Sequence, residues 1–188
     1  MSVNVYVLYC RFTCYSGVLT VTPNGHTVRL TPDGIIKTFG KNKVTLTTLG
    51  NIRRIYNANM RHVERGVKVK SVSEVIIESV GVPLGEAIES GMITDRGTII
   101  AGVRSALDQL HAMGIAHNDV ALCNVFLLRD GEVLLGDLEY CRPTTDIAPT
   151  GLYRSLPASS AQELDELQFT QFFVAEVDKK LQERAKKA

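Results

Sequence analysis

Three polar side chains in the middle of the chain have the types and the spacing of a metal-dependent phosphate site. Asp119 and Asn124 follow an amphipathic helix that closes at Gly114, and Asp137 follows a hairpin predicted over 125–135 from its apolar strands and Asp-Gly turn. Carboxylate and amide oxygens are the hard ligands that Mg²⁺ prefers. A neighbouring carboxylate can accept a proton from an attacking hydroxyl. One loop and one hairpin would therefore hold three groups able to act on a metal-bound phosphate.

The same stretch resembles the signature motifs of protein kinases. His-Asn-Asp at 117–119, with Asn124 five positions after its aspartate, is similar to the catalytic loop, and Asp-Leu-Glu at 137–139 is similar to the metal-binding Asp-Phe-Gly. The resemblance implies that Asp119 accepts or orients the proton of the attacking hydroxyl. It also implies that Asn124 and Asp137 hold Mg²⁺. A hairpin whose Asp and Asn residues serve only turns and caps would not explain the three groups in this order.

The resemblance implies an α+β fold of two lobes, as in a small, divergent or truncated member of the protein-kinase-like superfamily. Residues 1–80 are predicted to form a β-rich N-lobe with one helix on the nucleotide side, because short strand-like runs separated by Pro-Asn-Gly and Pro-Asp-Gly turns fill its first half. That helix is expected within 45–63. Residues 81–188 are predicted to form a short helical C-lobe with the catalytic loop and the metal-binding segment. The strongest helix, 98–113, has an apolar stripe of Ile99, Val103, Leu107 and Leu110.

A lysine in the strand Ile-Ile-Lys-Thr-Phe at 35–39 resembles the strand lysine with which protein kinases hold nucleotide phosphates. A cation on a rigid strand has a defined reach toward a polyanion, so Lys37 is the predicted phosphate lysine. An edge-strand lysine facing solvent is the alternative. The family pairs this lysine with a helix glutamate, but no acid lies between Asp33 and Glu64. Glu64, just beyond the helix, is the expected partner of Lys37; the alternative is that this partner is absent and that Asn51 faces its place. The competing lysines are Lys41, Lys43, Lys68 and Lys70.

Other positions correspond to the family pattern in part or depart from it. Residues 74–81 resemble the strand that leads into the kinase hinge, where Glu78 to Val80 would offer backbone groups to adenine; a buried strand with a linker is the alternative. No Gly-x-Gly-x-x-Gly run is present, which leaves coverage of the phosphates by backbone amides open. Asn118 replaces the arginine that receives activation-loop phosphate. Glu139 replaces a glycine, either as a third metal-facing carboxylate or as a stiffening residue.

The last helix is predicted to begin at a capping box, Ser160 to Glu163. Asp165 has two interpretations: the buried aspartate that binds the catalytic loop in the family, or an ordinary acid in the first turn of a helix. The expected apolar face consists of Leu164, Leu167, Phe172, Val174, Val177 and Leu181.

Bulk composition excludes several classes of protein. The net charge of +1 gives no general field that would attract nucleic acid or an anionic membrane, so neither is an expected partner. No apolar run approaches the roughly 20 residues that span a bilayer. The N-terminal stretch alternates and lacks the features of a signal peptide. Four cysteines form no disulfide framework in a chain of this size, which favours a reducing, cytoplasmic location.

These features support three functions. The first is an ATP- and Mg²⁺-dependent kinase that acts on protein Ser/Thr hydroxyls, with ATP and a hydroxyl substrate as partners. The second is a small-molecule kinase of the aminoglycoside-phosphotransferase type, favoured by the short C-lobe. The third is a pseudokinase that acts by contact with a regulatory protein, favoured by the missing glycine-rich loop and the uncertain helix glutamate.

Overall fold

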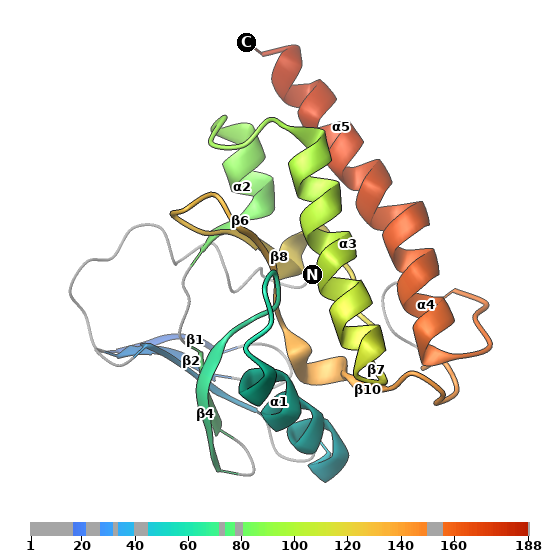
Figure 1. Cartoon of the computed structure of the whole chain (residues 1–188). Helices are drawn as coiled ribbons and strands as arrows, with labels where there is room; N and C mark the ends of the chain where they lie inside the picture. Colours follow the sequence, from blue (N-terminus) through green and yellow to red (C-terminus); the bar gives the residue numbers. More distant parts are fainter. Residues whose placement is uncertain are drawn as a thin grey trace.

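The computed structural model describes residues 17–21, 27–31, 34–39, 45–71, 74–77, 81–149 and 156–187. These residues form a mixed α and β fold, as predicted (Figure 1). The largest sheet is antiparallel, with the strand order β1-β2-β3-β5-β4. Its strands are β1 (Gly17–Val21), β2 (Thr27–Thr31), β3 (Gly34–Thr38), β4 (Gly66–Ser71) and β5 (Glu74–Ile77). Residues 1–16, the start of the predicted N-lobe, lie outside the described residues.

Lys37 lies at the centre of this sheet and faces inward. Its strand, β3, is the third of the five, with Val28 on one side and Val75 on the other. Ile35 and Phe39, at the alternate positions that share its face, belong to the apolar core. Lys37 itself is only 8% exposed. The alternative of a solvent-facing lysine on an edge strand is therefore wrong, because both neighbouring strands cover β3.

One helix follows β3 within the predicted range. Helix α1 (Leu46–Ala58) begins at Thr45, whose side chain accepts a hydrogen bond from the backbone N–H of Thr48. It ends at Asn59, which has a left-handed φ of 45°. Asparagine tolerates this conformation better than most residues. Helix α1 lies beside β4 (Figure 1).

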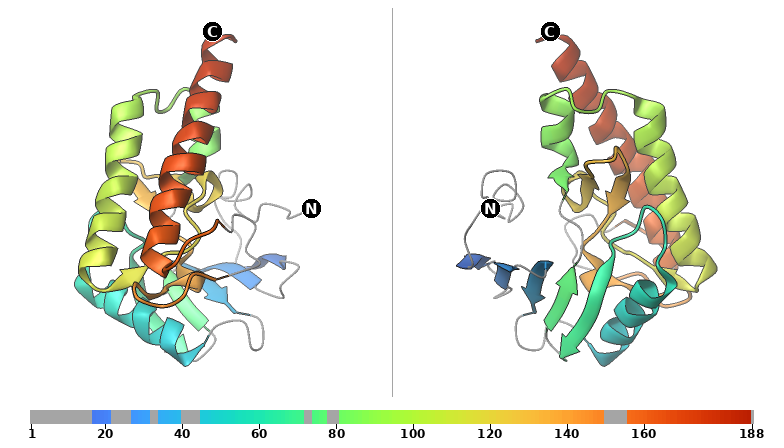
Figure 2. Two further views of the ribbon diagram at one scale, coloured as in Figure 1. Left: turned by 90° about the vertical axis from the view of Figure 1, so that its right-hand side faces the viewer. Right: turned by 60° about the vertical axis from the view of Figure 1, so that its left-hand side comes forward.

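Four further α-helices of the described residues lie on the side of the molecule away from β1 and β2 (Figures 1 and 2). They are α2 (Leu84–Glu89), α3 (Arg96–Ala112), α4 (Ala161–Leu167) and α5 (Val174–Ala185), the last two joined without a break by the π-helical turn η4 (Gln168–Phe173). The long rod α4-η4-α5 packs along α3 and α2. The predicted stripe of α3 is confirmed, because all four of its residues are 0% exposed.

The apolar face expected for the last helix is partly wrong. Leu164 and Val177 are buried as predicted, but Phe169 and Phe173 are the buried aromatic residues of the rod, whereas Phe172 is only partly buried. The π-helical turn explains the difference. It adds a residue to one turn and so rotates the following helix relative to regular α-helical spacing.

Two small sheets connect the helices to the larger sheet. One contains β6 (Val82–Pro83), β8 (Val125–Leu127) and β9 (Val133–Leu135), and the other pairs β7 (Ile115–Ala116) with β10 (Arg142–Pro143). The hairpin β8–β9 is the one predicted. A single apolar cluster runs from β3 through the hairpin to α5. None of the described helices is long and apolar enough to cross a membrane.

Candidate functional site

Asp119 and Asn124 form one hydrogen-bonded unit. The Asn124 side chain donates from Nδ2 to the Asp119 carboxylate at 2.8 Å and to the Asp119 backbone carbonyl at 2.9 Å. Asn124 ends the short 3-10 helix η2 (Leu122–Asn124), immediately before β8. Its own backbone carbonyl accepts from Gly136 N at 2.8 Å. The loop is therefore joined directly to the residue that precedes Asp137.

His117 strengthens this junction from inside. It is 0% exposed, and its Nδ1 accepts a hydrogen bond from Asp119 N at 3.2 Å. Because that nitrogen accepts, the ring proton resides on Nε2, which donates to Gly136 O at 2.9 Å. The ring thus joins the loop to the end of the hairpin.

Asp137 is held in an uncommon backbone conformation. Its φ is 67° and its ψ 61°, the left-handed region that non-glycine residues rarely adopt. It precedes the 3-10 helix η3 (Leu138–Tyr140), and its N–H donates to Glu64 Oε2 at 3.0 Å. Such conformations persist where the surroundings fix them, and they cluster at functional sites.

Lys37 reaches this end of the hairpin from the large sheet. Its Nζ forms an ion pair with Asp137 Oδ1 and lies 3.3 Å from Glu139 Oε2. The ammonium also lies 5.4 Å from the centroid of the Phe39 ring. All three charged side chains are largely buried. Lys37 therefore bridges two carboxylates of the segment predicted to bind metal.

Glu64, the expected partner of Lys37, lies buried beside the end of the hairpin. It accepts hydrogen bonds from Tyr56 Oη at 2.8 Å and from the backbone N–H of Asp137. A parallel bridge between Val63 and Leu135 fixes its position beside the hairpin. Burial raises the pKa of Glu64, although the positive charge of Lys37 lowers it. Glu64 thus contacts the backbone of the segment predicted to bind metal, and its pairing with Lys37 stays a prediction.

The site concentrates negative charge around one lysine. Burial, followed by the neighbouring carboxylates of Glu139 and Asp119, raises the pKa of Tyr140 to about 12. Burial raises the pKa of Cys141 as well. Both shifts have the sign expected where low polarity and carboxylates disfavour a further negative charge. A cation is the ligand that such a site attracts.

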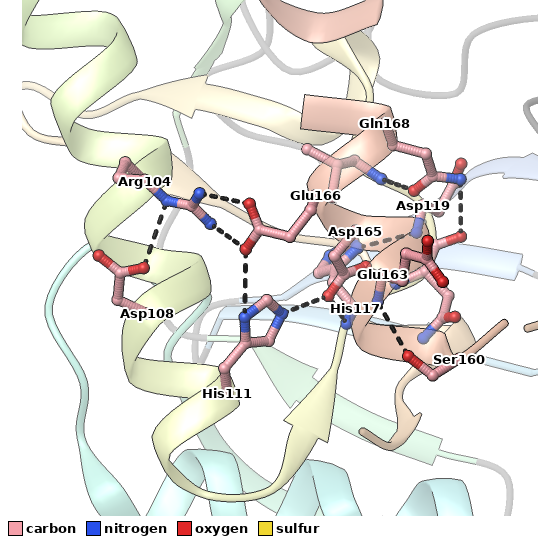
Figure 3. A network of polar contacts seen from close by, with 12 residues as sticks. Arg104, Asp108, His111, His117, Asp119, Ser160, Glu163, Asp165, Glu166 and Gln168 are labelled. Carbon is pink, nitrogen blue, oxygen red and sulfur yellow. Dashed lines mark hydrogen bonds and ion pairs between the residues drawn. The ribbon is translucent and has the colours of Figure 1, made fainter. Parts of the chain in front are cut away.

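Asp165 and Gln168 support the loop from the rod behind it (Figure 3). Both are 0% exposed. The Asp165 carboxylate accepts from His117 N at 2.8 Å and from Asn118 N at 2.6 Å, and His111 Nε2 lies 2.8 Å from it. The interpretation of Asp165 as a buried residue that binds the loop is therefore confirmed over that of an ordinary first-turn acid.

Further contacts extend this support toward α3. Glu166 accepts two hydrogen bonds from the Arg104 guanidinium, at 2.6 and 2.9 Å (Figure 3). Arg104 also lies over the Phe169 ring, 4.7 Å from its centroid.

The predicted capping box at the start of α4 forms in part. The Ser160 side chain accepts a hydrogen bond from Glu163 N, but the Glu163 carboxylate accepts from Ser159.

The residues present fit a magnesium ion. The two hydrogen bonds from Asn124 Nδ2 fix the orientation of its amide, which leaves Oδ1 with the weak S–H donor of Cys123 at 3.6 Å. This carbonyl oxygen and the carboxylate of Asp137 are hard ligands, and Mg²⁺ commonly takes one or two protein ligands beside water and phosphate oxygens. Within the described ranges there is no group of three or more His, Cys, Asp or Glu side chains arranged as a metal site.

Several predicted residues lie beyond what the structure describes. Glu78 and Val80, the expected hinge residues, fall outside the described residues, as do Lys41 and Lys43. The structure brings together Lys37, Glu64, Asp119, Asn124 and Asp137 by the contacts given above. The sequence interpretation missed Gln168 and Tyr56. A polar residue three positions after Asp165 on a buried helix face was the available signal for Gln168.

Two plant kinases are similar to parts of this chain. The serine/threonine-protein kinase WAG2 of Arabidopsis thaliana is 43% identical over 61 residues, which are 32% of this chain and 12% of WAG2. The mitogen-activated protein kinase kinase kinase 20 of the same plant is 28% identical over 129 residues, 63% of this chain and 33% of that kinase. No protein-family model matches the chain. The chain thus spans a third or less of each relative, and the likeness indicates a partial relationship to kinases.

Proposed function

We propose that this chain is an ATP- and Mg²⁺-dependent phosphotransferase of the protein-kinase type that acts on Ser/Thr hydroxyls. One observation carries the proposal: Asp119, Asn124 and the backbone before Asp137 form a single hydrogen-bonded unit, with Lys37 bound to Asp137. The partial likeness to two kinases supports it. In this proposal residues 1–80 are the N-lobe and 81–188 the C-lobe of a two-lobed kinase fold.

Each residue has a definite task in this reaction. Asp119 orients the substrate hydroxyl and accepts its proton as the new O–P bond forms and the bond to the leaving ADP breaks. Asn124 and Asp137 would hold the metal, which when bound with ATP neutralises charge on the phosphates. Lys37 orients the phosphates, and Glu64 fixes the backbone of Asp137. Glu78 to Val80 would receive the adenine.

Nucleotide binding is the first test. Mg²⁺ with ATP is expected to raise the Tm of the chain, because a ligand that binds only the folded state stabilises it. Asp137→Ala should abolish the rise, whereas Asp130→Asn, an exposed substitution in the hairpin turn, should preserve it. No shift at millimolar nucleotide would contradict both enzyme functions.

Phosphate transfer is the second test. Radiolabelled ATP is offered with a mixture of Ser/Thr peptides and, separately, with hydroxylated small molecules such as aminoglycosides. Label on peptides that disappears in Asp119→Ala supports the proposed function. Label on small molecules alone would replace it with the small-molecule kinase.

A pseudokinase is the second candidate, and one contact favours it. The Lys37 ammonium already bridges Asp137 and Glu139, so the groups that would meet phosphate and metal satisfy one another. Nucleotide binding without transfer to either substrate class would support this function.

A further inference from the structure

Gln168 contacts the catalytic loop on both sides of Asp119. Its Oε1 accepts a hydrogen bond from Val120 N at 2.9 Å, and its Nε2 donates to Asn118 O at 3.3 Å. The side chain is 0% exposed, and it approaches the loop from the rod behind it (Figure 3). One amide therefore brackets the backbone immediately before and after Asp119.

The chemistry of the amide suits this position. A glutamine side chain presents one acceptor and one donor group side by side, so it can pair with a carbonyl and an N–H of the same peptide segment. Asp165, one helical turn earlier, can only accept, and it takes the N–H groups of His117 and Asn118. The two side chains divide the work: Asp165 anchors the start of the loop, and Gln168 anchors the residues around Asp119.

The loop needs such an anchor because its backbone is strained. Asn118 has a φ of 67°, a conformation that costs a non-glycine residue about 1 kcal/mol or more. Among the described residues, its buried side-chain amide has no hydrogen-bond partner. Asn118 therefore does not stabilise its own conformation through its side chain, and its backbone hydrogen bonds to Asp165 and Gln168 do so instead.

The local helix geometry marks the same point. Gln168 is the first residue of η4, the π-helical turn between α4 and α5. π-helical turns are rare in proteins, and those that occur often lie at functional sites. The turn is packed firmly, with Phe169 and Phe173 stacked at a centroid distance of 5.9 Å. Gln168 therefore projects from a rigid support.

We propose that Gln168 is a positioning residue for Asp119: it fixes the backbone on both sides of Asp119 and so sets the direction of the carboxylate. The proposal rests on the proposed function in that Asp119 is the group that meets the substrate hydroxyl. Gln168 touches neither substrate nor nucleotide in this role. Its loss should therefore impair the transfer step and leave nucleotide binding largely intact.

Two substitutions and one matched control test this role in the full chain. Gln168→Met removes both hydrogen bonds at similar volume, and Gln168→Glu keeps the acceptor for Val120 but places a carboxylate against Asn118 O. Gln171→Met, an exposed change in the same turn, is the control. If Gln168→Met fails to fold, Gln168→Glu carries the test.

Amide hydrogen exchange and steady-state kinetics are the measurements. Gln168→Met should exchange faster than wild type within 117–121, including at the Val120 N–H. Gln168→Glu, which keeps the acceptor for Val120, should exchange faster at Asp119, whose peptide contains the Asn118 carbonyl that the new carboxylate repels. In both variants kcat should fall by about 10²-fold, the effect of misplacing a catalytic group by about 1 Å. The KM for ATP should change by less than about threefold, because the nucleotide contacts lie elsewhere. Unchanged exchange, or unchanged kcat with faster exchange, would overturn the proposal. If wild type transfers no phosphate, the proposed function fails, and the exchange of Val120 N–H still decides whether Gln168 holds the loop.

Discussion

The two sides of the candidate site are held by different forces. The loop anchor, Asp165 and Gln168, binds residues 117–120 through short hydrogen bonds to backbone groups. The lysine cluster, made of Lys37, Asp137 and Glu139, is held by ion pairs between side chains. Backbone hydrogen bonds fix a geometry, whereas a group of charges can be rearranged by another charge. The loop is therefore built in advance, and the lysine cluster is the part able to respond to a charged ligand.

Under the proposed function, changes in the loop should affect phosphate transfer, and changes in the lysine cluster should affect nucleotide binding. A nucleotide with a metal brings phosphates that compete for Lys37 and a cation that competes for Asp137. The ion pair between those residues is largely buried, so its loss has to be offset by new charged contacts. Asp119 loses no ion pair when the ligand binds, since hydrogen bonds from its own N–H to His117 and from Asn124 to its carbonyl already hold it.

Asp119→Asn should reduce phosphate transfer strongly and tests whether the loop acts independently of the lysine cluster. Transfer should fall by about 10²- to 10⁴-fold, the usual contribution of a positioned general base. The rise in Tm with Mg²⁺ and ATP should persist, because the lysine cluster is intact. A phosphate-transfer assay and a thermal melt of the same preparation measure both. Loss of nucleotide binding in this variant would show that the two sides are not independent.

Asp165→Ala should remove the loop anchor at a cost to folding. The variant leaves two buried backbone N–H groups and His111 without their acceptor, which should lower the free energy of unfolding by about 3 kcal/mol. Urea unfolding followed by circular dichroism measures the change. Asp178→Asn, which breaks an exposed ion pair with Arg96, is the control and should cost far less. Equal losses in the two variants would contradict the anchoring role.

Glu139→Gln should affect the lysine cluster and leave the loop intact. With one of its two carboxylate partners neutralised, Lys37 is freer to pair with phosphate, and nucleotide affinity should rise by about three- to tenfold. Titration calorimetry with Mg²⁺ and ATP measures it. Glu89→Gln, which neutralises the exposed partner of Lys180, is the matched control. Weaker binding in Glu139→Gln would mean that Glu139 holds Lys37 in place for the nucleotide and does not compete with it.

Local patterns in the sequence were sufficient to locate the loop but not its supports. Helical spacing and an Asp-Gly turn depend on near neighbours. For this reason α3 and the hairpin were predictable, and so was the placing of Asp119, Asn124 and Asp137 on the loop and at the end of the hairpin. Lys37 and Asp137 are 100 residues apart, and Gln168 and Val120 are 48 apart. Contacts at such separations depend on the packing of whole elements.

One wrong expectation and one missed contact have a common cause in tertiary structure. The π-helical turn changed which aromatic residues of the last helix are buried, and no simple spacing rule predicts such a turn. The expectation for Glu64 considered only Lys37, whereas a parallel bridge beside the hairpin brings Glu64 to the Asp137 backbone. In both cases the contact depends on how whole elements pack, which the residue types alone do not give.

The smallest expected effect is on the pH dependence of stability, and it concerns Glu64. Burial raises its pKa above the ordinary value of 4.5, so the folded state favours the protonated form. The associated stability is present below pH 4.5 and is lost as the pH rises through the raised pKa. Glu64→Gln, which cannot ionise, should therefore gain Tm relative to wild type as the pH rises from about 4 to 8, by about 2–4 °C for each kcal/mol in a chain of this size.

Glu163 provides the opposite sign in the same experiment. Hydrogen bonds from Ser159 lower the pKa of Glu163, so its contribution is present above pH 4.5 and is lost as the pH falls. Glu163→Gln should lose Tm relative to wild type at neutral pH, and the difference should narrow in acid. Parallel trends in the two variants would mean that general charge governs both. Opposite trends would show that the ionised carboxylate of Glu64 lowers stability, as expected of a buried group whose role is its contact with Asp137.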